Sequence, residues 1–375
     1  MKTAFLAIPV VLVFILLASS QQVIENPEKP LAKNAGRVVA LKEVLKILDE
    51  GTDQYYFKYP RNLRIAPDDS IFVQDENQIL QFDKSGKFVR NYFKKGQGPG
   101  EMTYAGDVFF TDKNIVIQNS SPVKILLFDY SGAYLREFPV RQSMRALIRL
   151  SHVFNNIYYF NGYGFPQVKG EPQFVDVLQA MTAIADGTDE VKTLMSFPVK
   201  KYVISSGGGG ALFDIGKFMA VQYQQKYLLI SHTPEYLIKI YDPENDKVVR
   251  TFRREYERVK SPPETDESKK GAAIINGKRY TAPSQKYVND VVSIFTHKNE
   301  IWIATSTDVK DKGILIDVFN FDGVYFDNFY LKGPEKSKIL FTRTDAAVIS
   351  GDYLYSIEKN EDETCAIKKY KIGGS

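Results

Sequence analysis

The chain has 375 residues, of which 44% are hydrophobic and 25% are charged, a composition typical of a globular protein with a sizeable core. The formal net charge is only +4, with 49 basic and 45 acidic residues spread along the sequence, so no concentrated basic face points to nucleic-acid binding. The 23 Tyr and 25 Phe favour a fold rich in β-strands, and the single cysteine, Cys365, excludes an intrachain disulfide.

The first 20 residues have the pattern of an export signal. Lys2 is followed by an apolar run over residues 4–17 and by the small residues Ala18, Ser19 and Ser20. The alternative is an uncleaved anchor, but the run is shorter than the roughly 20 residues that a membrane-spanning helix needs. We therefore expect a signal peptide over 1–20, a flexible segment over 21–35, export to the periplasm or the medium, and no membrane span after cleavage.

Internal repeats appear next along the chain. Residues 65–74 (IAPDDSIFVQ) align with residues 109–118 (FFTDKNIVIQ), and the phrase at 79–90 (ILQFDKSGKFVR) returns at 125–136 (ILLFDYSGAYLR). Each unit reads as strand, polar turn, strand, loop, strand, a turn with Gly, and a last strand. Glycine suits that last turn because it adopts positive φ without steric cost.

The second strand of the unit can be followed through the whole sequence. Its successive starts are 44, 42, 71, 73 and 52 residues apart, so long insertions lengthen two of the repeats. Four short strands per unit, repeated in this way, are typical of a β-propeller. The sequence therefore predicts an all-β fold, a six-bladed β-propeller with four-stranded antiparallel blades. The six second strands are expected to begin near Ile71, Ile115, Ile157, Leu228, Ile301 and Tyr353.

The last repeat ends without a fourth strand, so another segment of the chain is needed to close the ring. The spare apolar segment 37–48 would supply that strand and pair the edges that would otherwise stay open. Leu41, Val44, Leu45 and Leu48 also fit the apolar stripe of a helix. We favour the strand, so that residues 36–375 form a single propeller domain closed by an N-terminal strand in the last blade.

A glycine-rich loop, KKGQGPGEM at residues 94–102, lies between the first two complete units. Its glycine spacing matches neither the dinucleotide-binding nor the P-loop pattern, Pro99 removes one backbone donor, and no helix is expected after it. We interpret it as a turn that joins two blades. With the Phe-Asp-x-x-Gly hairpins, residues 96–102 resemble the linkers of exported bacterial six-bladed β-propeller proteins of the NHL-repeat-like type, which are often lipoproteins. Ser20 stands where the lipidated cysteine of such proteins would be.

Three long insertions interrupt the later repeats, at residues 161–173, 201–216 and 255–287. The repeat places all three on one face of the ring, and such lengths are uncommon unless they are functional or disordered. Drift in tolerant surface loops is the competing explanation. Aromatic and basic side chains suit glycan, peptide or anionic ligands. The candidate ligand-binding residues are Tyr163, Phe165, Lys278, Arg279 and Tyr280.

Catalytic sites are less well supported by the sequence. The resemblance implies that some relatives are hydrolases, lactonases or lyases with calcium or zinc in the central funnel. His152, His232 and His297 fall in different phases of their repeats, which argues against a shared zinc site. A calcium site would draw on residues that start the innermost strands. Its candidate ligands are Asn62, Asp107, Asp290 and Asp345.

The most economical functional hypothesis is a non-catalytic binding or scaffold protein of the bacterial cell envelope, without a cofactor. It would engage a protein, peptide or glycan on the face that carries the long inter-blade loops. The alternative is a calcium-dependent hydrolase or lactonase of the gluconolactonase-like propeller type. Arg141, Arg145 and Arg149, which lead into the third repeat, are expected to be solvated surface charges.

Overall fold

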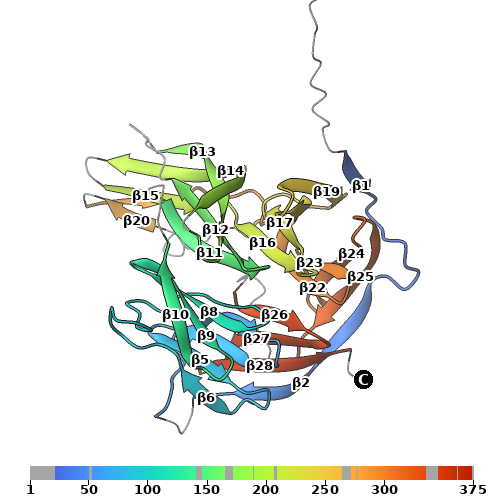
Figure 1. The fold of residues 1–375 in the computed structure, drawn as a ribbon. Coiled ribbons are helices and arrows are strands. Elements are labelled where there is room, and N and C mark those ends of the chain that lie inside the picture. Colours follow the sequence, from blue (N-terminus) through green and yellow to red (C-terminus); the bar gives the residue numbers. More distant parts are fainter. Residues whose placement is uncertain are drawn as a thin grey trace, which may run out of the picture.

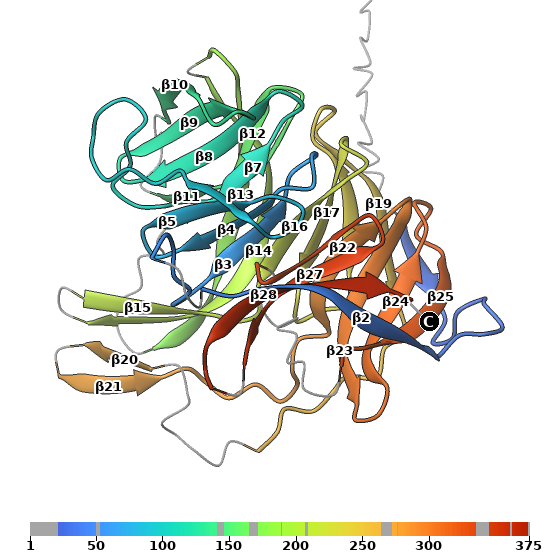
Figure 2. The ribbon, with the colours of Figure 1, turned by 90° about the horizontal axis from the view of Figure 1, so that it is seen from below.

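The structure is a computed structural model that describes residues 22–49, 53–140, 146–164, 172–188, 190–206, 209–263, 272–275, 277–334, 345–360 and 362–373. The expected signal peptide and Phe165 lie outside this part of the chain. The described residues form strands arranged as a ring of six blades (Figures 1 and 2). They contain no helix that is long and apolar enough to cross a membrane.

The first three blades follow the chain in simple order. The first blade consists of β3 (Arg61–Ile65), β4 (Ile71–Asp75), β5 (Gln78–Phe82) and β6 (Phe88–Asn91). The second consists of β7 (Val108–Phe110), β8 (Asn114–Ser120), β9 (Val123–Asp129) and β10 (Tyr134–Pro139). The third has five strands: β11 (Ala146–Phe154), β12 (Ile157–Gly164), β13 (Gln173–Ala185), β14 (Val191–Ser206) and β15 (Gly209–Asp214).

The last three blades involve the N-terminal residues. The fourth blade consists of β16 (Phe218–Tyr223), β17 (Tyr227–His232), β18 (Ile238–Asp242) and β19 (Lys247–Arg254), with β1 (Val23–Asn26) on its outer edge. The fifth consists of β22 (Val291–His297), β23 (Glu300–Val309), β24 (Gly313–Phe319) and β25 (Tyr325–Lys332). The sixth consists of β26 (Ala347–Ser350), β27 (Tyr353–Lys359), β28 (Cys365–Ile372) and β2 (Arg37–Ile47). The fold class predicted from the sequence is confirmed, including the position of all six second strands.

Closure by the N-terminal segment is also confirmed, and it is more extensive than expected. The second half of β2 pairs antiparallel with β28 from Leu41 to Ile47, and its first half pairs parallel with β25. The fifth and sixth blades are thereby joined into one eight-stranded sheet. The helical alternative for residues 37–48 is therefore wrong, because the strand pairs two open edges at once.

Residues 22–35, which were expected to be flexible, instead contain β1, and this strand pairs parallel with β19. Asn26 is buried and fixes the segment to two blades. Its Nδ2 donates to the carbonyl oxygens of Arg253 (3.0 Å) and Gly323 (2.9 Å), and its Oδ1 accepts from the backbone amide of Tyr325 (2.9 Å). Residues 23–47 thus pair in turn with the outer edges of the fourth, fifth and sixth blades. A single sequence offers no repeat pattern for such a parallel edge pairing, so the flexible-segment expectation failed here.

Six clusters of buried apolar side chains fill the six blade-to-blade interfaces. The second strands explain how this works, because successive side chains of a strand point to opposite faces. On β8, Ile115 and Ile117 pack against the first blade, whereas Val116 packs against the third. A strand covered on both faces reads as a continuous apolar run, and these runs are the source of the repeat seen in the sequence.

The glycine-rich loop is a turn, as predicted. Gly96 N donates to the carbonyl oxygen of Met102 (3.0 Å), and Gly98 N donates to the carboxylate of Glu101 (2.9 Å). Gly100, with φ of 73°, donates its N–H to Glu137 of the next blade (3.0 Å). Because a carbonyl oxygen and two carboxylates of the protein itself accept these donors, the loop joins two blades and does not present a phosphate cradle.

The described parts of the two longer insertions contain additional strands, of which β15 extends the third blade and two others form a separate hairpin. The residues at 201–216 form the end of β14 and the added strand β15, and the insertion at 255–287 contains the hairpin β20 (Ala272–Ile275) and β21 (Lys278–Thr281). β15 contacts β20, and both views show these strands extending together with β13 and β14 at one edge of the ring (Figures 1 and 2). The expectation that these insertions share one side of the molecule is met for the parts that the structure describes.

Candidate functional site

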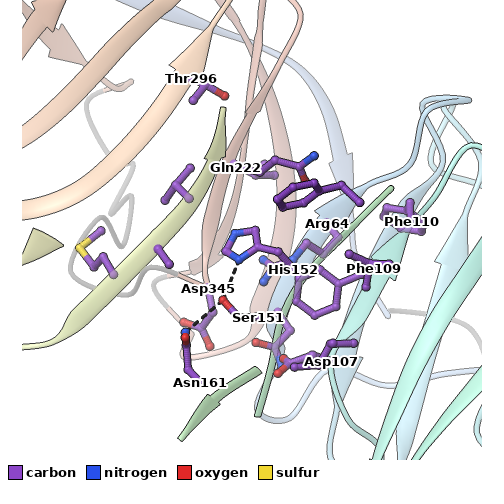
Figure 3. Close-up of a pocket in the computed structure, with 18 of the residues that line it drawn as sticks. Arg64, Asp107, Phe109, Phe110, Ser151, His152, Asn161, Gln222, Thr296 and Asp345 are labelled. Atoms are coloured by element: carbon purple, nitrogen blue, oxygen red, sulfur yellow. Dashed lines mark hydrogen bonds between the residues drawn. The ribbon is translucent and has the colours of Figure 1, made fainter. Parts of the chain in front are cut away.

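A cavity of about 1460 Å³ lies on the axis of the ring. Every innermost strand contributes to its wall, because the strand nearest the axis in each blade leaves its inner edge uncovered. Figure 3 shows several of these side chains turned toward a common space. One lining residue from each innermost strand, in chain order, is Arg64, Phe109, His152, Gln222, Thr296 and Ile349.

Arg149 on β11 is part of a polar cluster in the cavity wall. Its Nη2 donates to Oδ1 of Asp107 (2.8 Å) and to Oδ1 of Asn62 (2.9 Å), while its Nε donates to the other Asp107 oxygen. The hydrogen bond to Asp107 raises the pKa of Arg149. Asn62 is held in turn by Gln74, whose amide donates to the carbonyl oxygen of Ala105. Arg149 is an exposed charge, as the sequence suggested, although its guanidinium is also paired with a carboxylate in the cavity wall; Arg141 and Arg145 lie outside the described residues.

The four residues of the calcium alternative do not converge. Asn62, Asp107 and Asp345 line the cavity, but Asn62 and Asp107 accept hydrogen bonds from the Arg149 guanidinium, a cation in its own right. Asp290 is outside this wall and accepts from Nε of Arg258 (2.8 Å). Within the described ranges, no group of three or more His, Cys, Asp or Glu side chains is arranged to hold a metal ion. As arranged here, these residues do not fit calcium.

His152 lies in the same wall next to a serine. The Ser151 Oγ is 2.7 Å from His152 Nδ1, and Asn161 Nδ2 donates to Ser151 Oγ (3.0 Å; Figure 3). Burial, with a smaller contribution from the nearby positive charge of Arg64, lowers the pKa of His152 from 6.5 to about 3. A general base works best with a pKa near the working pH, so this pair is poorly suited to activate a nucleophile at neutral pH.

The low pKa of His152 predicts a specific dependence of stability on pH. The folded state holds the imidazole neutral, whereas the unfolded chain takes up a proton near pH 6.5. The contribution is therefore complete above about pH 6.5 and is lost as the pH falls toward 3. Between pH 7 and pH 5 we expect this residue alone to remove about 2 kcal/mol from the free energy of unfolding. Urea unfolding at both pH values, compared with His152→Gln, should show the smaller pH dependence in the variant. Equal pH dependence in both proteins would contradict the assignment.

The extended third blade, with its long strands β12 to β15, forms a further part of the cavity wall. Tyr163 on β12, Gln179 on β13, Lys201 on β14 and Asp214 on β15 all line the cavity. Lys201 is buried, forms an ion pair with Asp214, and places Nζ 3.9 Å from the centre of the Tyr163 ring. The candidate Tyr163 is therefore a cavity residue held against a cation.

The opposite face of the same sheet carries a row of aromatic side chains, of which Phe174 is exposed and Tyr202 and Phe213 are half-buried. Phe174, Tyr202 and Phe213 are register partners on β13, β14 and β15, with neighbouring ring centres 5.1 Å and 6.5 Å apart. The other predicted candidates lie on the adjoining hairpin. Lys278, Arg279 and Tyr280 are on β21, where Lys278 Nζ lies 5.1 Å from the Tyr280 ring centre, and none of the three lines the cavity.

Sequence reasoning missed Arg64, which projects into the middle of the cavity from β3. A signal for it existed. The strand reads Arg61-Asn-Leu-Arg-Ile65, and a charged residue between the buried Leu63 and the partly buried Ile65 is unusual in an innermost strand unless it is paired or functional. The innermost strands are the least regular part of the repeat, so the pattern could not show which of their side chains share the axis.

Comparison with known proteins agrees with this architecture. Residues 21–197 match the model of a family described as 6-bladed beta-propeller. No curated protein matches the sequence significantly. Among solved structures, a protein of Bacteroides fragilis NCTC 9343 that is provisionally named an exported protein superimposes with a TM-score of 0.52 at 12% identity, over 94% of this chain and 99% of that one.

Two further structures are similar at lower scores. Streptogramin B lyase has a TM-score of 0.44 at 12% identity, covering 89% of this chain and 98% of its own. The calcium-binding protein regucalcin of Agrobacterium tumefaciens str. C58 has a TM-score of 0.42 at 10% identity, covering 91% and 97%. At such identities the likeness concerns the fold alone. The chain is a six-bladed β-propeller whose N-terminal half matches a family of that description.

Proposed function

We propose that this protein is an exported, non-catalytic binding protein of the bacterial cell envelope that takes up its ligand in the central cavity. The main support for the proposal is the part of the cavity wall that the extended third blade forms. Tyr163, Gln179, Lys201 and Asp214, from four successive strands, face the cavity rather than the outer surface. Random sequence drift in a surface loop would not be expected to place a buried, ion-paired lysine against an aromatic ring in the cavity wall.

The size and lining of the cavity support a ligand larger than a metal ion. Typical small-molecule sites have volumes of about 300–1,000 Å³. A cavity of about 1460 Å³ accommodates a ligand of the size of a saccharide or a short peptide. The wall is mixed in character, and its aromatic rings, amides and guanidinium groups suit recognition of such ligands by polar contacts beside aromatic surfaces.

The calcium-dependent hydrolase is the less favoured candidate. Three of its four candidate oxygen ligands, Asn62, Asp107 and Asp290, are engaged by Arg149 or Arg258. The Ser151–His152 pair has a base that stays neutral far below physiological pH. Export is part of the proposal and rests on the pattern of residues 1–20, in agreement with the name of the similar Bacteroides fragilis protein. The relationship to NHL-type repeats rests on the linker at residues 96–102.

A thermal-shift screen tests the proposal, because a ligand that binds only the folded state raises the melting temperature by mass action. The compounds are neutral sugars, sugar acids, dipeptides and nucleotides at millimolar concentration. The matched control is Gln222→Trp, which fills the cavity from β16 at a side chain without a hydrogen bond among the described residues. We expect at least one compound class to raise the melting temperature of the wild type by a few degrees and to leave Gln222→Trp unchanged.

Two results would count against this function. The cavity is not the binding site if no compound class raises the melting temperature of the wild type, or if the melting temperature of Gln222→Trp rises equally. A calcium chelator is included as a separate arm, and it is expected to leave the melting temperature unchanged. A fall of many degrees with chelator, reversed by calcium, would favour the hydrolase alternative.

A further inference from the structure

Arg64 differs from two other cations of the cavity wall, Arg149 and Lys201. Arg149 is paired with Asp107, and Lys201 is paired with Asp214. No carboxylate of the described chain lies within ion-pair distance of Arg64. Its only hydrogen bond there runs from Nη1 to the carbonyl oxygen of Leu63 (3.0 Å). A guanidinium group has five N–H donors, so most of the donors of Arg64 face the cavity without an acceptor.

The surroundings of Arg64 hold its guanidinium in place without neutralising it. The group lies 5.4 Å from the centre of the Phe109 ring, and His152, whose imidazole is neutral, lies nearby (Figure 3). Burial lowers the pKa of Arg64, and the positive charge of Arg149 lowers it further, although Asp107 and Asp345 act in the opposite direction. The group nevertheless stays protonated at any physiological pH. A fixed positive charge on a half-buried side chain attracts an anion more strongly than the same charge on a fully exposed one.

A second unpaired atom lies in the same wall. Asn161 Oδ1 is buried and has no hydrogen-bond partner in the described chain, although its Nδ2 donates to Ser151. Buried acceptors are normally satisfied, and one that is not points to a missing donor. A ligand hydroxyl or N–H group supplies such a donor. The wall therefore holds unpaired donors on Arg64 and, enclosed behind its surface, the unpaired Oδ1 of Asn161, which a ligand reaches once that side chain turns.

We propose that the ligand of this cavity is a small organic acid whose carboxylate pairs with Arg64 and which also carries a hydroxyl or N–H donor. The inference rests on the proposed binding function and names its ligand class. The planar fork of a guanidinium matches the two oxygens of a carboxylate, which gives two parallel hydrogen bonds. Sugar acids and the C-terminal residues of short peptides share this chemistry.

Calorimetric titration at low ionic strength with four probes tests the proposal. D-glucuronate is matched by neutral D-glucose, and the dipeptide Ala-Ala is matched by Ala-Ala-amide. We expect at least one acid to bind while its neutral match does not. Arg64→Gln should weaken that binding by about tenfold to a hundredfold, as the loss of hydrogen bonds to a charged group implies. Arg64→Lys, which keeps the charge but loses the fork, should give an intermediate loss.

Arg61→Gln is the matched control, because Arg61 is an exposed arginine on the same strand and is not part of the cavity wall. It should bind the acid as the wild type does, and circular dichroism should show that all three variants are folded. The proposal is overturned if neither acid binds at 10 mM, if the neutral matches bind equally well, or if Arg64→Gln binds as the wild type does. One alternative outcome is a neutral compound that binds the wild type and Arg64→Gln alike but not Gln222→Trp. That result would support binding in the cavity and refute only the assignment of an organic acid as the ligand.

Discussion

Removal of residues 22–47 is expected to abolish the cooperative folding of the chain. The deletion opens the outer edges of β19, β25 and β28 together, and it removes the buried side chains of Leu41 and Ile47 from two blade interfaces. Burial of one such side chain contributes about 1.5–3 kcal/mol, and the paired backbone adds to it, whereas the whole stability of a typical domain is only about 5–15 kcal/mol. Circular dichroism during heating should show no cooperative transition.

The matched control for this deletion removes residues 22–35 only. That variant loses β1 but keeps β2, so the ring stays closed between the fifth and sixth blades. We expect it to fold and to unfold cooperatively at a lower temperature. If the longer deletion melts as sharply as the control and at the same temperature, β2 contributes nothing to the stability of the ring.

Asp317→Asn is expected to lower the free energy of unfolding by about 3–5 kcal/mol, because it leaves a buried cation without its partner. Asp317 on β24 is fully buried between the fourth and fifth blades. One of its oxygens accepts from Arg254 Nε (2.7 Å) and from the hydroxyl of Tyr236 (2.7 Å), and the other accepts from the hydroxyl of Tyr325 (2.7 Å). The Arg254 guanidinium also lies 4.9 Å from the centre of the Tyr256 ring.

The control for this prediction is Asp322→Asn, which removes an exposed ion pair with Arg250 of the same length, 2.7 Å. Exposed pairs contribute about 0–1 kcal/mol, so equilibrium unfolding in guanidinium chloride should barely change. Replacing both partners of the buried pair, as Asp317→Leu with Arg254→Met, should cost less than Asp317→Asn alone, since no buried charge is left unpaired. If Asp317→Asn and Asp322→Asn lower the free energy of unfolding by similar amounts, the buried network contributes little to stability.

The repeated part of the fold could be predicted from the sequence because one physical constraint recurs in every blade. Each second and third strand is covered on both faces, as Ile71, Phe72 and Val73 of β4 illustrate, so the same apolar phrase is needed six times. The missing last strand was found by the same logic, since a ring with open edges leaves backbone groups unpaired. These features depend on composition and spacing, which a single sequence displays.

The features outside the repeat could not be predicted in this way. β1 is a short parallel edge strand whose position depends on the side chain of Asn26, and β15 and β20–β21 are additions with no counterpart in the other blades. Cavity residues such as Arg64 and Arg149 are distant in sequence and meet only because the ring closes. Tyr163 was found from its place in an insertion, whereas Lys278, Arg279 and Tyr280 share that side of the molecule without reaching the cavity.

The proposed function requires that a ligand binds in the central cavity. The decisive measurement is a crystal structure of the protein with the compound selected by the thermal-shift screen. We expect electron density for the compound on the ring axis, in contact with the innermost strands β3, β7 and β11 and with the extended third blade. Density only on the outer faces of the blades, or a calcium ion bound by Asp107 and Asp345 after displacement of Arg149, would contradict this function.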